Sequence, residues 1–488
     1  MEIKKYLPFV FIFLLYVIIG ISIYSFAEVE LTDDAKVFIG AGKQAIMDAP
    51  ISGLLHAVDN SWELKPIANR MIYYFVASWS EIFGWGEDLI LKIVALLLLW
   101  VILIGFCNYA TEKYYDKNPI DSDMVAGIIF IGMLTLSNLF FFQAEWWAVM
   151  LSFMVMWLLL TEMPTLQGLA GILSVVIIFL KLSTLLLIPT IFIAFIIIKG
   201  FPSRDDLVAY GAGLAGGGCF ALAWILYLPN MLPDMLLSVQ LAHAAKGVDI
   251  PPFDGVNYLF HYLFVNVWNA PIIGIGIVAA LCIVAIRISF MMNFRDMVSI
   301  DLDKIFLLAA LWIFPLASIL IQKEFFSYHY TIMIFPAVIT VIEFLRYFWL
   351  LQDRLYLVIA IVVVIFAVWF VGNSLWSDSY SSQDAFWSRT ASDNATFNEK
   401  YDLSGELLYL DIPSATYYLD AKSACRMIGS LPIERKLVTT REYSENLACI
   451  QGYQGSYVIA KHGSGMPALL PNYTKIEEGI AWDVYARN

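Results

Sequence analysis

The sequence has few charged residues for its length. Only 15% of its 488 residues are Asp, Glu, Lys or Arg, whereas 60% are hydrophobic. An ordinary soluble domain is about 25% charged and about 45–50% apolar. A chain of this composition has too little charge to cover its apolar surface in water. The composition therefore excludes a soluble enzyme, a disordered protein and a nucleic-acid binder.

Basic residues are scarcer than acidic ones. The 29 Lys and Arg stand against 42 Asp and Glu, which gives a net charge of −13. This balance argues against a polybasic surface for DNA or for anionic lipid heads. The sequence also lacks an internal repeat, a zinc signature, a Walker loop, a dinucleotide glycine fingerprint and a Gly-x-Ser-x-Gly elbow. These missing motifs argue against a nucleotide-driven pump.

Long apolar runs are abundant instead, and the mean hydropathy is +0.74. A transmembrane helix needs roughly 20 mostly apolar residues. We interpret 166–198 as two short spans rather than one helix kinked at Pro189. The sequence thus predicts a polytopic α-helical membrane protein with eleven spans, at residues 6–26, 88–109, 124–142, 146–161, 166–180, 182–198, 207–228, 271–286, 305–321, 330–345 and 355–372.

Loop charges predict the orientation of these spans. With the N-terminus inside, the cytoplasmic segments hold 11 Lys or Arg in 58 residues, and the opposite loops hold 7 in 115. Basic residues concentrate on the cytoplasmic side of membrane proteins. We therefore expect a multi-pass protein of the cell (plasma or inner) membrane, with a cytoplasmic N-terminus and an extracytoplasmic C-terminus.

The composition changes after residue 372. We predict a transmembrane domain at 1–372 with a long first outer loop at 27–87, a polar linker at 373–400, and a small extracytoplasmic α/β domain at 401–488. Segments 407–411, 456–460 and 480–486 resemble strands, and 414–424 and 440–451 resemble helices. Cys425 and Cys449 in this domain are either a disulfide or two separate buried thiols.

Polar residues gather at the predicted outer ends of the spans. In a bilayer protein such a cluster marks the working face. Five separate outer connections contribute ionisable or aromatic side chains, and this convergence is the main functional signal. The candidates are Asp33, Asp34, Trp62, Lys65, Gln143, Glu145, Lys181, His243, His261, Lys323, Tyr328 and His329.

Several candidates also have a plain structural interpretation, although the cluster from Lys323 to His329 is harder to explain in that way. Asp33 and Asp34 are compatible with a solvated helix start, since acids suit the positive end of the helix dipole. A lysine such as Lys181 commonly anchors a helix at the membrane surface. His243 and His261 are more often surface or packing residues than ligands. The apolar, aromatic segment 67–83 fits a helix lying along the membrane surface better than a span.

Several short motifs together resemble the GT-C superfamily of membrane glycosyltransferases, which use polyprenyl-phosphate sugars. The resemblance covers nearly the whole chain in order and is closest to the protein O-mannosyltransferase and lipid A aminoarabinose transferase branch. Ile67 replaces the second proline of that branch's Lys-Pro-Pro stretch. The motifs are Thr32-Asp33-Asp34-Ala35-Lys36-Val37-Phe38, Lys65-Pro66, Gln143-Ala144-Glu145, Leu180-Lys181-Leu182-Ser183 and the segment from Lys323 to Tyr330.

The oligosaccharyltransferase branch fits less well. Its Trp-Trp-Asp-Tyr-Gly signature is missing, and only the fragment from Trp482 to Tyr485 is present, within a predicted strand. The resemblance implies a GT-C fold and transfer of a hexosyl or pentosyl group from a polyprenyl-phosphate donor to a hydroxyl of a lipid, glycan or protein acceptor. It implies no certain cofactor. A divalent metal is left open, with Asp33, Asp34 and Glu145 as its ligands if one is bound.

The resemblance also suggests a role for each candidate. Asp33 occupies the place of the first acid in the family loop and is expected to act as general base, with Asp34 orienting the acceptor or a cation. The expected phosphate-binding residues are Lys323, His329, Lys65 and Lys181. The expected contacts of the sugar or acceptor are Glu145, Gln143, Trp62, Tyr328, His243 and His261.

A carrier or flippase for a polar lipid is the alternative function. It would share an outer polar pocket without performing chemistry. Transporters, however, commonly contain paired repeats and broken helices at mid-membrane. The charges of this sequence lie at one predicted face and no repeat is visible, which favours the enzyme.

Overall fold

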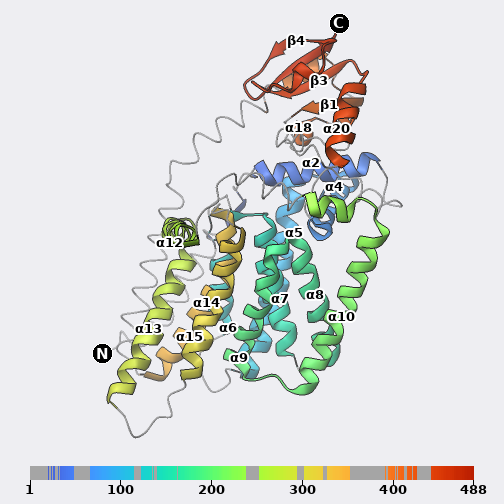
Figure 1. The fold of residues 1–488 in the computed structure, drawn as a ribbon. Coiled ribbons are helices and arrows are strands. Elements are labelled where there is room, and N and C mark those ends of the chain that lie inside the picture. The colour runs from blue at the N-terminus through green and yellow to red at the C-terminus, as the bar shows by residue number, and fades with distance from the viewer. Residues whose placement is uncertain are drawn as a thin grey trace. The chain divides into compact units, whose positions relative to one another are not determined.

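The computed structural model shows a mainly helical protein with a small β-sheet near its C-terminus (Figure 1). It describes residues 20, 23–24, 26–27, 31, 33–48, 66–114, 122–134, 136, 140–161, 163–237, 252–293, 302–322, 327–351, 391, 394–401, 403, 405–410, 415–419, 421–425 and 441–488. The chain forms two compact units. Unit 1 comprises residues 1–30, 92–221 and 250–376, and unit 2 comprises 31–91, 222–249 and 377–488.

Unit 1 is helical in its described part. Two of its helices, α5 and α10, cross the boundary between the units. Its elements are α5 (Glu87–Tyr114), α6 (Ser122–Leu134), α7 (Ala144–Leu160), α8 (Pro164–Leu180), η3 (Leu182–Leu186), α9 (Leu187–Lys199), α10 (Arg204–Tyr227), α12 (Pro252–Asn269), α13 (Pro271–Asn293), α14 (Leu302–Gln322), η4 (Ser327–Met333) and α15 (Ile334–Leu351).

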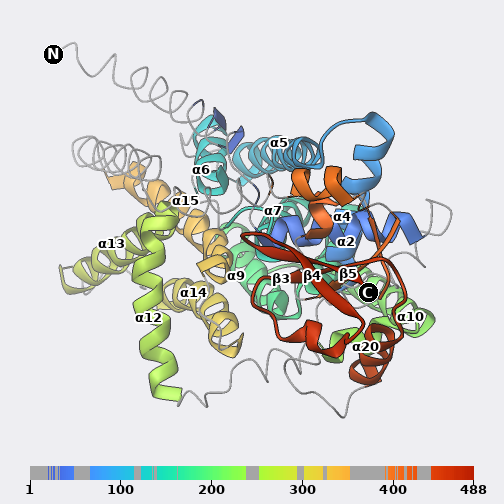
Figure 2. The same cartoon turned by 90° about the horizontal axis from the view of Figure 1, so that it is seen from above.

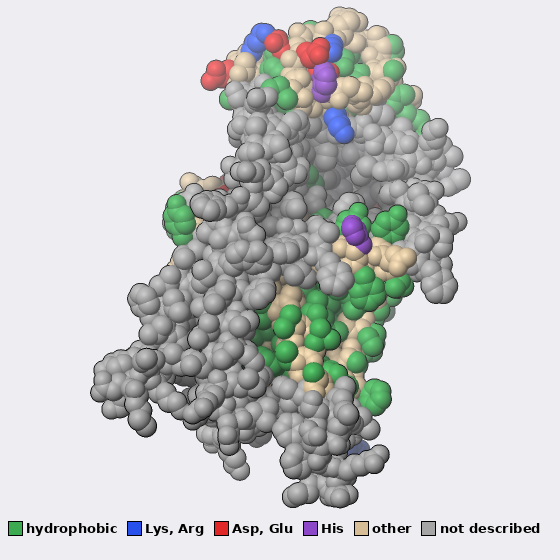
Figure 3. Space-filling view, turned by 90° about the vertical axis from the view of Figure 1, so that its left-hand side faces the viewer, with side chains coloured by type: hydrophobic (Ala, Val, Ile, Leu, Met, Phe, Trp, Pro, Cys, Tyr) green, Lys and Arg blue, Asp and Glu red, His purple; other side chains and the backbone are tan. Residues whose placement is uncertain are grey.

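Five described helical segments are long and apolar enough to cross a membrane. They are Glu87–Gly105, Leu182–Lys199, Arg204–Tyr227, Ile305–Gln322 and Tyr328–Leu345. Shorter apolar helices cover Val125–Leu134, Ala144–Leu160, Pro164–Leu180 and Pro271–Ala285. On the face drawn in Figure 3, the described helices present mainly hydrophobic side chains, whereas most visible charges lie on the sheet of unit 2.

Nine of the eleven predicted spans therefore coincide with apolar helices. The prediction of two short spans in 166–198 agrees with the separate helices α8 and α9, which are divided at Lys181. Most of the first span at 6–26, and all of the last at 355–372, lie outside the described residues. Eleven spans thus stay a prediction.

Glycine allows α8 and α10 to pack closely within unit 1. A Cβ on Gly213 would overlap the backbone of Gly168, and one on Gly171 would overlap the carbonyl of Tyr210. Small residues at such crossings let two helix backbones approach each other. Not every glycine of α10 serves this purpose, because a Cβ on Gly211 or Gly216 would meet open space.

Helix α12 differs in direction from its neighbours in unit 1. Figure 1 views it nearly end-on and Figure 2 lengthwise, so it runs across the direction of α13. Leu259 and Leu263 form its buried side, and Tyr258, Phe260 and Tyr262 are exposed. This pattern is typical of a helix that lies along a surface.

Unit 2 combines part of the predicted first outer loop with the C-terminal region. Helix α2 (Asp33–Asp48) packs against α4 (Ile67–Phe83) and against the short helix α18 (Ala415–Tyr418). A Cβ on Gly42 would overlap the carbonyl of Tyr73, so the helix pair α2–α4 depends on a bare backbone at that position.

The C-terminal sheet has five strands in the order β2-β1-β3-β5-β4. The pairs β1–β2 and β1–β3 are parallel, whereas β3–β5 and β4–β5 are antiparallel. One face packs on Phe397 and on Ala41 of α2, and the other on Ile450 of α20. The strands are β1 (Gly405–Leu410), β2 (Ala421–Ser423), β3 (Tyr457–Lys461), β4 (Tyr473–Glu478) and β5 (Trp482–Arg487), with α20 at Arg441–Gly452 and η5 at Met466–Leu469.

Most predicted elements of this region occur near their predicted places. The exception is 414–424, where a helix was expected. Only 415–418 is helical, and 421–423 forms strand β2 on the edge of the sheet. Part of the predicted linker is also structured, because 394–401 is helical. A disulfide joins Cys425 to Cys449 with a Cα–Cα distance of 5.9 Å. The division into 1–372, 373–400 and 401–488 stays a prediction.

Candidate functional site

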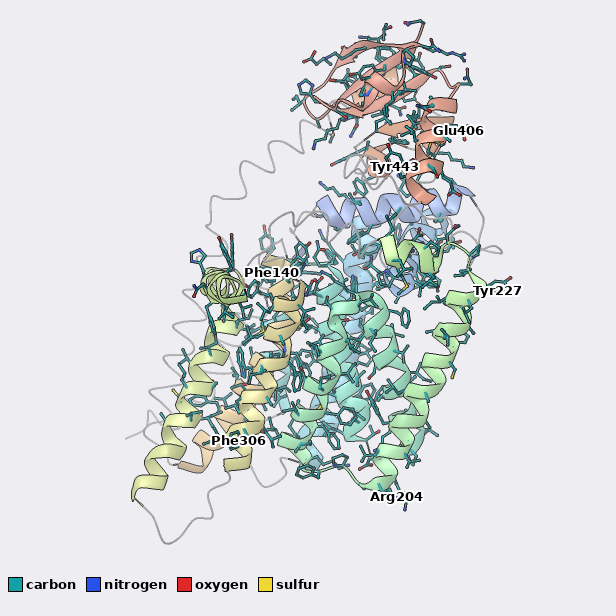
Figure 4. The ribbon with its side chains drawn as sticks, in the orientation of Figure 1. Phe140, Arg204, Tyr227, Phe306, Glu406 and Tyr443 are labelled. Carbon is teal, nitrogen blue, oxygen red and sulfur yellow. A yellow bond between two sulfur atoms is a disulfide. The ribbon has the colours of Figure 1, made fainter. Side chains whose placement is uncertain are left out.

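Glu145 begins the arrangement that we regard as the candidate site. It lies in the first turn of α7, and its side chain is only 2% exposed. The positive end of the helix dipole favours a negative charge there. Phe140, which shortly precedes it, lies at the opposite end of the unit 1 helices from Phe306 (Figure 4). The buried carboxylate is therefore at one end of the bundle.

Lys181 lies where the chain breaks between two apolar helices. Its backbone is extended, with φ −161° and ψ 130°, after α8 ends and before η3 begins. The Thr184 hydroxyl shares its one proton between the carbonyls of Ile177 and Lys181, each 2.6 Å away. The Ser318 hydroxyl of α14 donates to the carbonyl of Ser183, also at 2.6 Å. These side chains satisfy carbonyls that a continuous helix would pair, and so they stabilise the break.

Tyr328 and His329 come from η4, a third segment of unit 1. His329 is fully buried, and its ring lies edge-on to the Tyr328 ring with centroids 4.5 Å apart. The adjacent Tyr330 hydroxyl donates a 3.0 Å hydrogen bond to the carbonyl of Leu259 on α12. Helix α12 therefore fixes the short helix that carries the histidine.

Glu145, Lys181 and His329 meet side chain to side chain. Lys181 Nζ lies 2.5 Å from Glu145 Oε1 and 2.9 Å from His329 Nε2. His329 Nε2 is 3.6 Å from Glu145 Oε1, and Lys181 Nζ is 5.4 Å from the centre of the Tyr328 ring. We call these four residues the outer cluster, because the sequence predicts them at the outer ends of the spans. Residues that are far apart in the sequence thus form one compact group within unit 1.

The geometry indicates how charge is distributed in the outer cluster. A lysine ammonium has only donors, so the 2.9 Å contact requires His329 Nε2 to accept. The imidazole is then neutral and carries its proton on Nδ1. Lys181 keeps a 17% exposed side chain, whereas Glu145 and His329 are buried. The outer cluster therefore presents one partly accessible cation that a carboxylate, an imidazole and an aromatic ring hold in place.

An unusual turn precedes Glu145. Phe142 has φ 61°, the one positive φ of a non-glycine residue in the described part of the chain. A bulky residue rarely adopts this conformation and needs support from its surroundings. The support comes from a fully buried aromatic cluster in which Phe142 packs against Phe26, Trp146 and Trp147. The buried Gln143 is the residue immediately before α7.

The other predicted site residues are distributed as follows. Asp33 and Asp34 are the first two residues of α2 in unit 2, but their side chains lie outside the described residues. His261 is exposed on α12, with its ring 5.4 Å from the Tyr262 ring. The structure therefore does not test the catalytic pair or the complete phosphate site. The positions outside the described residues are Trp62, Lys65, His243 and Lys323.

The described residues hold no group of three or more His, Cys, Asp or Glu side chains that could hold a metal ion. Glu145 has a lysine and a histidine beside it, and a cation such as Lys181 disfavours a second cation at the same carboxylate. The outer cluster therefore does not fit a divalent metal. The carboxylates of Asp33 and Asp34 are not part of this comparison.

Sequence reasoning missed the residues that brace unit 2. The Gln44 amide of α2 bonds to β2, and a buried ion pair joins Arg70 to Asp234 at 2.7 Å. A polar residue on the buried side of the amphipathic stretch 35–47 was the available signal for Gln44. For Arg70 and Asp234 the sequence offers no signal of pairing, since they are 164 residues apart.

Comparison with known proteins finds solved structures of low similarity and no relative by sequence. No family model matches the chain, and no curated protein matches it. A solved structure of the archaeal oligosaccharyltransferase AglB from Archaeoglobus fulgidus, in complex with an inhibitory peptide and a dolichol-phosphate, is 12% identical with a TM-score of 0.47. The alignment covers 94% of this chain and 70% of that one.

A second structure of an Archaeoglobus fulgidus oligosaccharyltransferase, in complex with Zn and sulfate, is 11% identical with a TM-score of 0.44. That alignment covers 97% of this chain and 73% of the other. Oligosaccharyltransferases are the branch that the sequence analysis disfavours, and the choice of branch stays a prediction.

Proposed function

We propose that this protein is a membrane glycosyltransferase of the GT-C type. It moves a sugar from a polyprenyl-phosphate donor to an acceptor hydroxyl on the extracytoplasmic face of the cell membrane, with inversion at the sugar carbon. The observation that supports the proposal best is the outer cluster. A half-buried lysine beside a buried histidine, at one end of a bundle of membrane-length helices, fits a phosphate at the surface of a bilayer.

The phosphate leaving group explains the cations. As the bond between the sugar carbon and the phosphate oxygen breaks, negative charge grows on the phosphate. Preorganised donors stabilise such charge strongly in a site that excludes water. Lys181 is held by Glu145 before the donor binds, and it exchanges that carboxylate for a phosphate oxygen when the donor arrives. Lys323, Lys65 and His329 complete the predicted phosphate site.

The acceptor hydroxyl needs a base. Its oxygen forms a bond to the sugar carbon on the side opposite the phosphate, and its proton passes to Asp33, so polyprenyl phosphate leaves as the anion. An aspartate is effective in this role when its pKa lies near the working pH. Asp34 orients the acceptor. The sugar and the acceptor are surrounded by Tyr328, Trp62, Gln143, Glu145, His243 and His261.

One assay separates this function from its alternative. Purified protein in lipid vesicles receives a radiolabelled polyprenyl-phosphate sugar and an extract of acceptors from the cell envelope, and released polyprenyl phosphate is measured. The enzyme releases it only with acceptor present, and Asp33→Asn abolishes release while the folded protein still binds the donor lipid. Near-normal release by Asp33→Asn would exclude Asp33 as the base.

A carrier or flippase gives the opposite pattern in the same vesicles. The labelled lipid would then cross the bilayer intact, with no release of polyprenyl phosphate from any acceptor mixture. Mass spectrometry of the lipid that co-purifies with the protein adds an independent readout. A sugar-phosphate polyprenol in that fraction would identify the donor, and its mass would distinguish a hexosyl from a pentosyl group.

A further inference from the structure

Helix α4 of unit 2 presents an exposed apolar stripe. Phe75, Trp79, Ile82 and Phe83 are each between 43% and 60% exposed. Their spacing of four, three and one residues places them on one face of the helix. Large apolar side chains that gather in this way mark an interaction surface rather than ordinary scattered exposure.

The stripe continues through the turn into the next helix. Gly84 ends α4 with φ 67°, a left-handed conformation that suits glycine. The Trp85 carbonyl accepts a 2.6 Å hydrogen bond from the Ser80 hydroxyl. The Phe83 ring lies 6.4 Å from Trp79 and 5.5 Å from Trp85, measured between ring centroids. The five exposed residues Phe75, Trp79, Ile82, Phe83 and Trp85 form what we call the aromatic ridge.

The opposite face of α4 packs against other elements of unit 2. Tyr73 packs beneath Gly42 of α2, and Arg70 makes a 2.7 Å ion pair with Asp234 in which both side chains are almost fully buried. Turning the helix to hide the aromatic ridge would expose these groups and break a buried charge pair. The ridge is therefore a fixed feature of the surface.

What covers the ridge follows from its continuity with a membrane span. Helix α5 begins at Glu87, shortly after the ridge, and its segment Glu87–Gly105 is long and apolar enough to cross a bilayer. Its exposed residues Leu89, Leu97, Trp100 and Ile104 recur on one side, as expected for a face in contact with lipid. Trp and other aromatic side chains concentrate at the boundary where such a span enters the membrane.

We propose that the aromatic ridge is inserted into the interfacial layer of the bilayer, so that α4 lies along the membrane surface beside the start of α5. The occupant is the boundary between lipid headgroups and acyl chains rather than a protein partner. No Lys or Arg occurs from residue 71 to residue 91. Insertion therefore depends on apolar burial and needs neither anionic lipid nor low salt.

Depth-dependent quenching in the full chain tests this proposal. Cys107, Cys219 and Cys282 are replaced by Ala, the Cys425–Cys449 disulfide is kept, and one new cysteine carries a fluorescent label. Trp79→Cys and Ile82→Cys report on the ridge. Glu81→Cys is the matched control, because it is exposed on the same helix about 200° around the axis from Trp79. Samples are reconstituted in nanodiscs with spin-labelled lipids.

We expect labels at 79 and 82 to be quenched several-fold more by lipids spin-labelled near the headgroup than by aqueous iodide. The label at 81 should show the reverse preference. The quenching at 79 and 82 should be the same in zwitterionic discs and in discs with 30% anionic lipid. Quenching by iodide alone would overturn the proposal, because the ridge would then lie in water. Protection from both quenchers would also overturn it, because protein would then cover the ridge.

Discussion

Gln44 and Ser423 join a helix of the first predicted outer loop to the edge of the C-terminal sheet. The Ser423 backbone N–H donates a 2.6 Å hydrogen bond to Gln44 Oε1. The same side-chain amide donates from Nε2 to the carbonyl of Ala421 at 2.7 Å. Edge strands carry unpaired backbone groups that proteins must cover. The side chain of Gln44 thus pairs with β2 as a neighbouring strand would. This contact holds helix α2, which begins with the acidic residues Asp33 and Asp34.

Gln44→Ala should therefore weaken the contact between α2 and the C-terminal sheet within unit 2. Two backbone groups of β2 lose their partners, and each unsatisfied group costs about 1–3 kcal/mol. We expect the apparent melting temperature to fall by several degrees, with faster proteolysis between α18 and α20. Met47→Ala, on the same helix but 39% exposed, is the control and should leave both unchanged. Equal effects of the two variants would contradict this role of Gln44.

The buried ion pair between Arg70 and Asp234 leads to a second prediction about the stability of unit 2. Their side chains are 1% and 0% exposed. Removing one partner of a buried ion pair leaves an uncompensated charge and costs about 3–5 kcal/mol, whereas replacing both with apolar groups is often neutral. Arg70→Met and Asp234→Leu should each lower the melting temperature strongly, and the double variant should recover most of the loss. Additive losses in the double variant would show that the two charges do not depend on each other.

The C-terminal sheet of unit 2 should lose stability in alkaline solution. Burial, with a smaller contribution from Tyr473, raises the pKa of Tyr453 to about 12. An unfolded chain releases this proton near pH 10, whereas the folded protein retains it to about pH 12. The contribution of Tyr453 to the stability of the folded protein is therefore fully present below pH 10 and decreases as the pH rises from 10 to 12. The Tyr453 hydroxyl shares its one proton between the carbonyls of Glu406 and Tyr457, 3.1 and 2.8 Å away.

Tyr453→Phe tests this assignment. The variant loses the two hydrogen bonds, so it should be less stable than the parent at pH 8. Between pH 10 and 12, its free energy of unfolding should nevertheless fall less steeply with pH than that of the parent. The difference in slope should correspond to at most one proton. Denaturant titrations at several pH values measure how the free energy of unfolding depends on pH, and Tyr443→Phe on α20 is the control. A parallel loss in parent and Tyr453→Phe would contradict the assignment to Tyr453.

The sequence predicted the elements whose pattern is local. Apolar runs predicted the helices α5 to α10 and α13 to α15. Short runs of hydrophobic residues predicted the strands β1 and β3. Strand β4 was missed because its side chains are largely exposed and polar, so no hydrophobic alternation marks it. Strand β2 was assigned to a helix because its structure depends on pairing with β1 and on Gln44, which are distant in the sequence.

The outer cluster was predictable in part. Ionisable residues near span ends are costly without partners, so Glu145, Lys181 and His329 could be grouped from the sequence as one polar face. The sequence did not predict which side chains touch. The break of the chain at Lys181 and the left-handed Phe142 determine those distances, and both depend on packing by side chains of other segments.

Opposite charges in the outer cluster predict opposite effects on phosphate binding. Lys181→Met removes a cation, and hydrogen bonds to charged groups contribute about 1.5–3 kcal/mol. Polyprenyl phosphate without a sugar should therefore bind about 10- to 100-fold more weakly. Glu145→Gln removes the anion that competes with the phosphate for Lys181, so the same lipid should bind more tightly. Calorimetric titration in nanodiscs measures both, and a folding defect would weaken binding in each variant.

Lys199→Met is the matched control for this prediction. Lys199 ends α9, the helix that follows the break at Lys181, and its Nζ lies 3.9 Å from Asp206 Oδ2. It is a lysine paired with a carboxylate at the other end of the same helical segment, with no contact to the outer cluster in the described part of unit 1. Its loss should leave binding of the phosphate unchanged. Weaker binding in both lysine variants would mean that net charge, rather than the position of Lys181, controls the affinity for the donor.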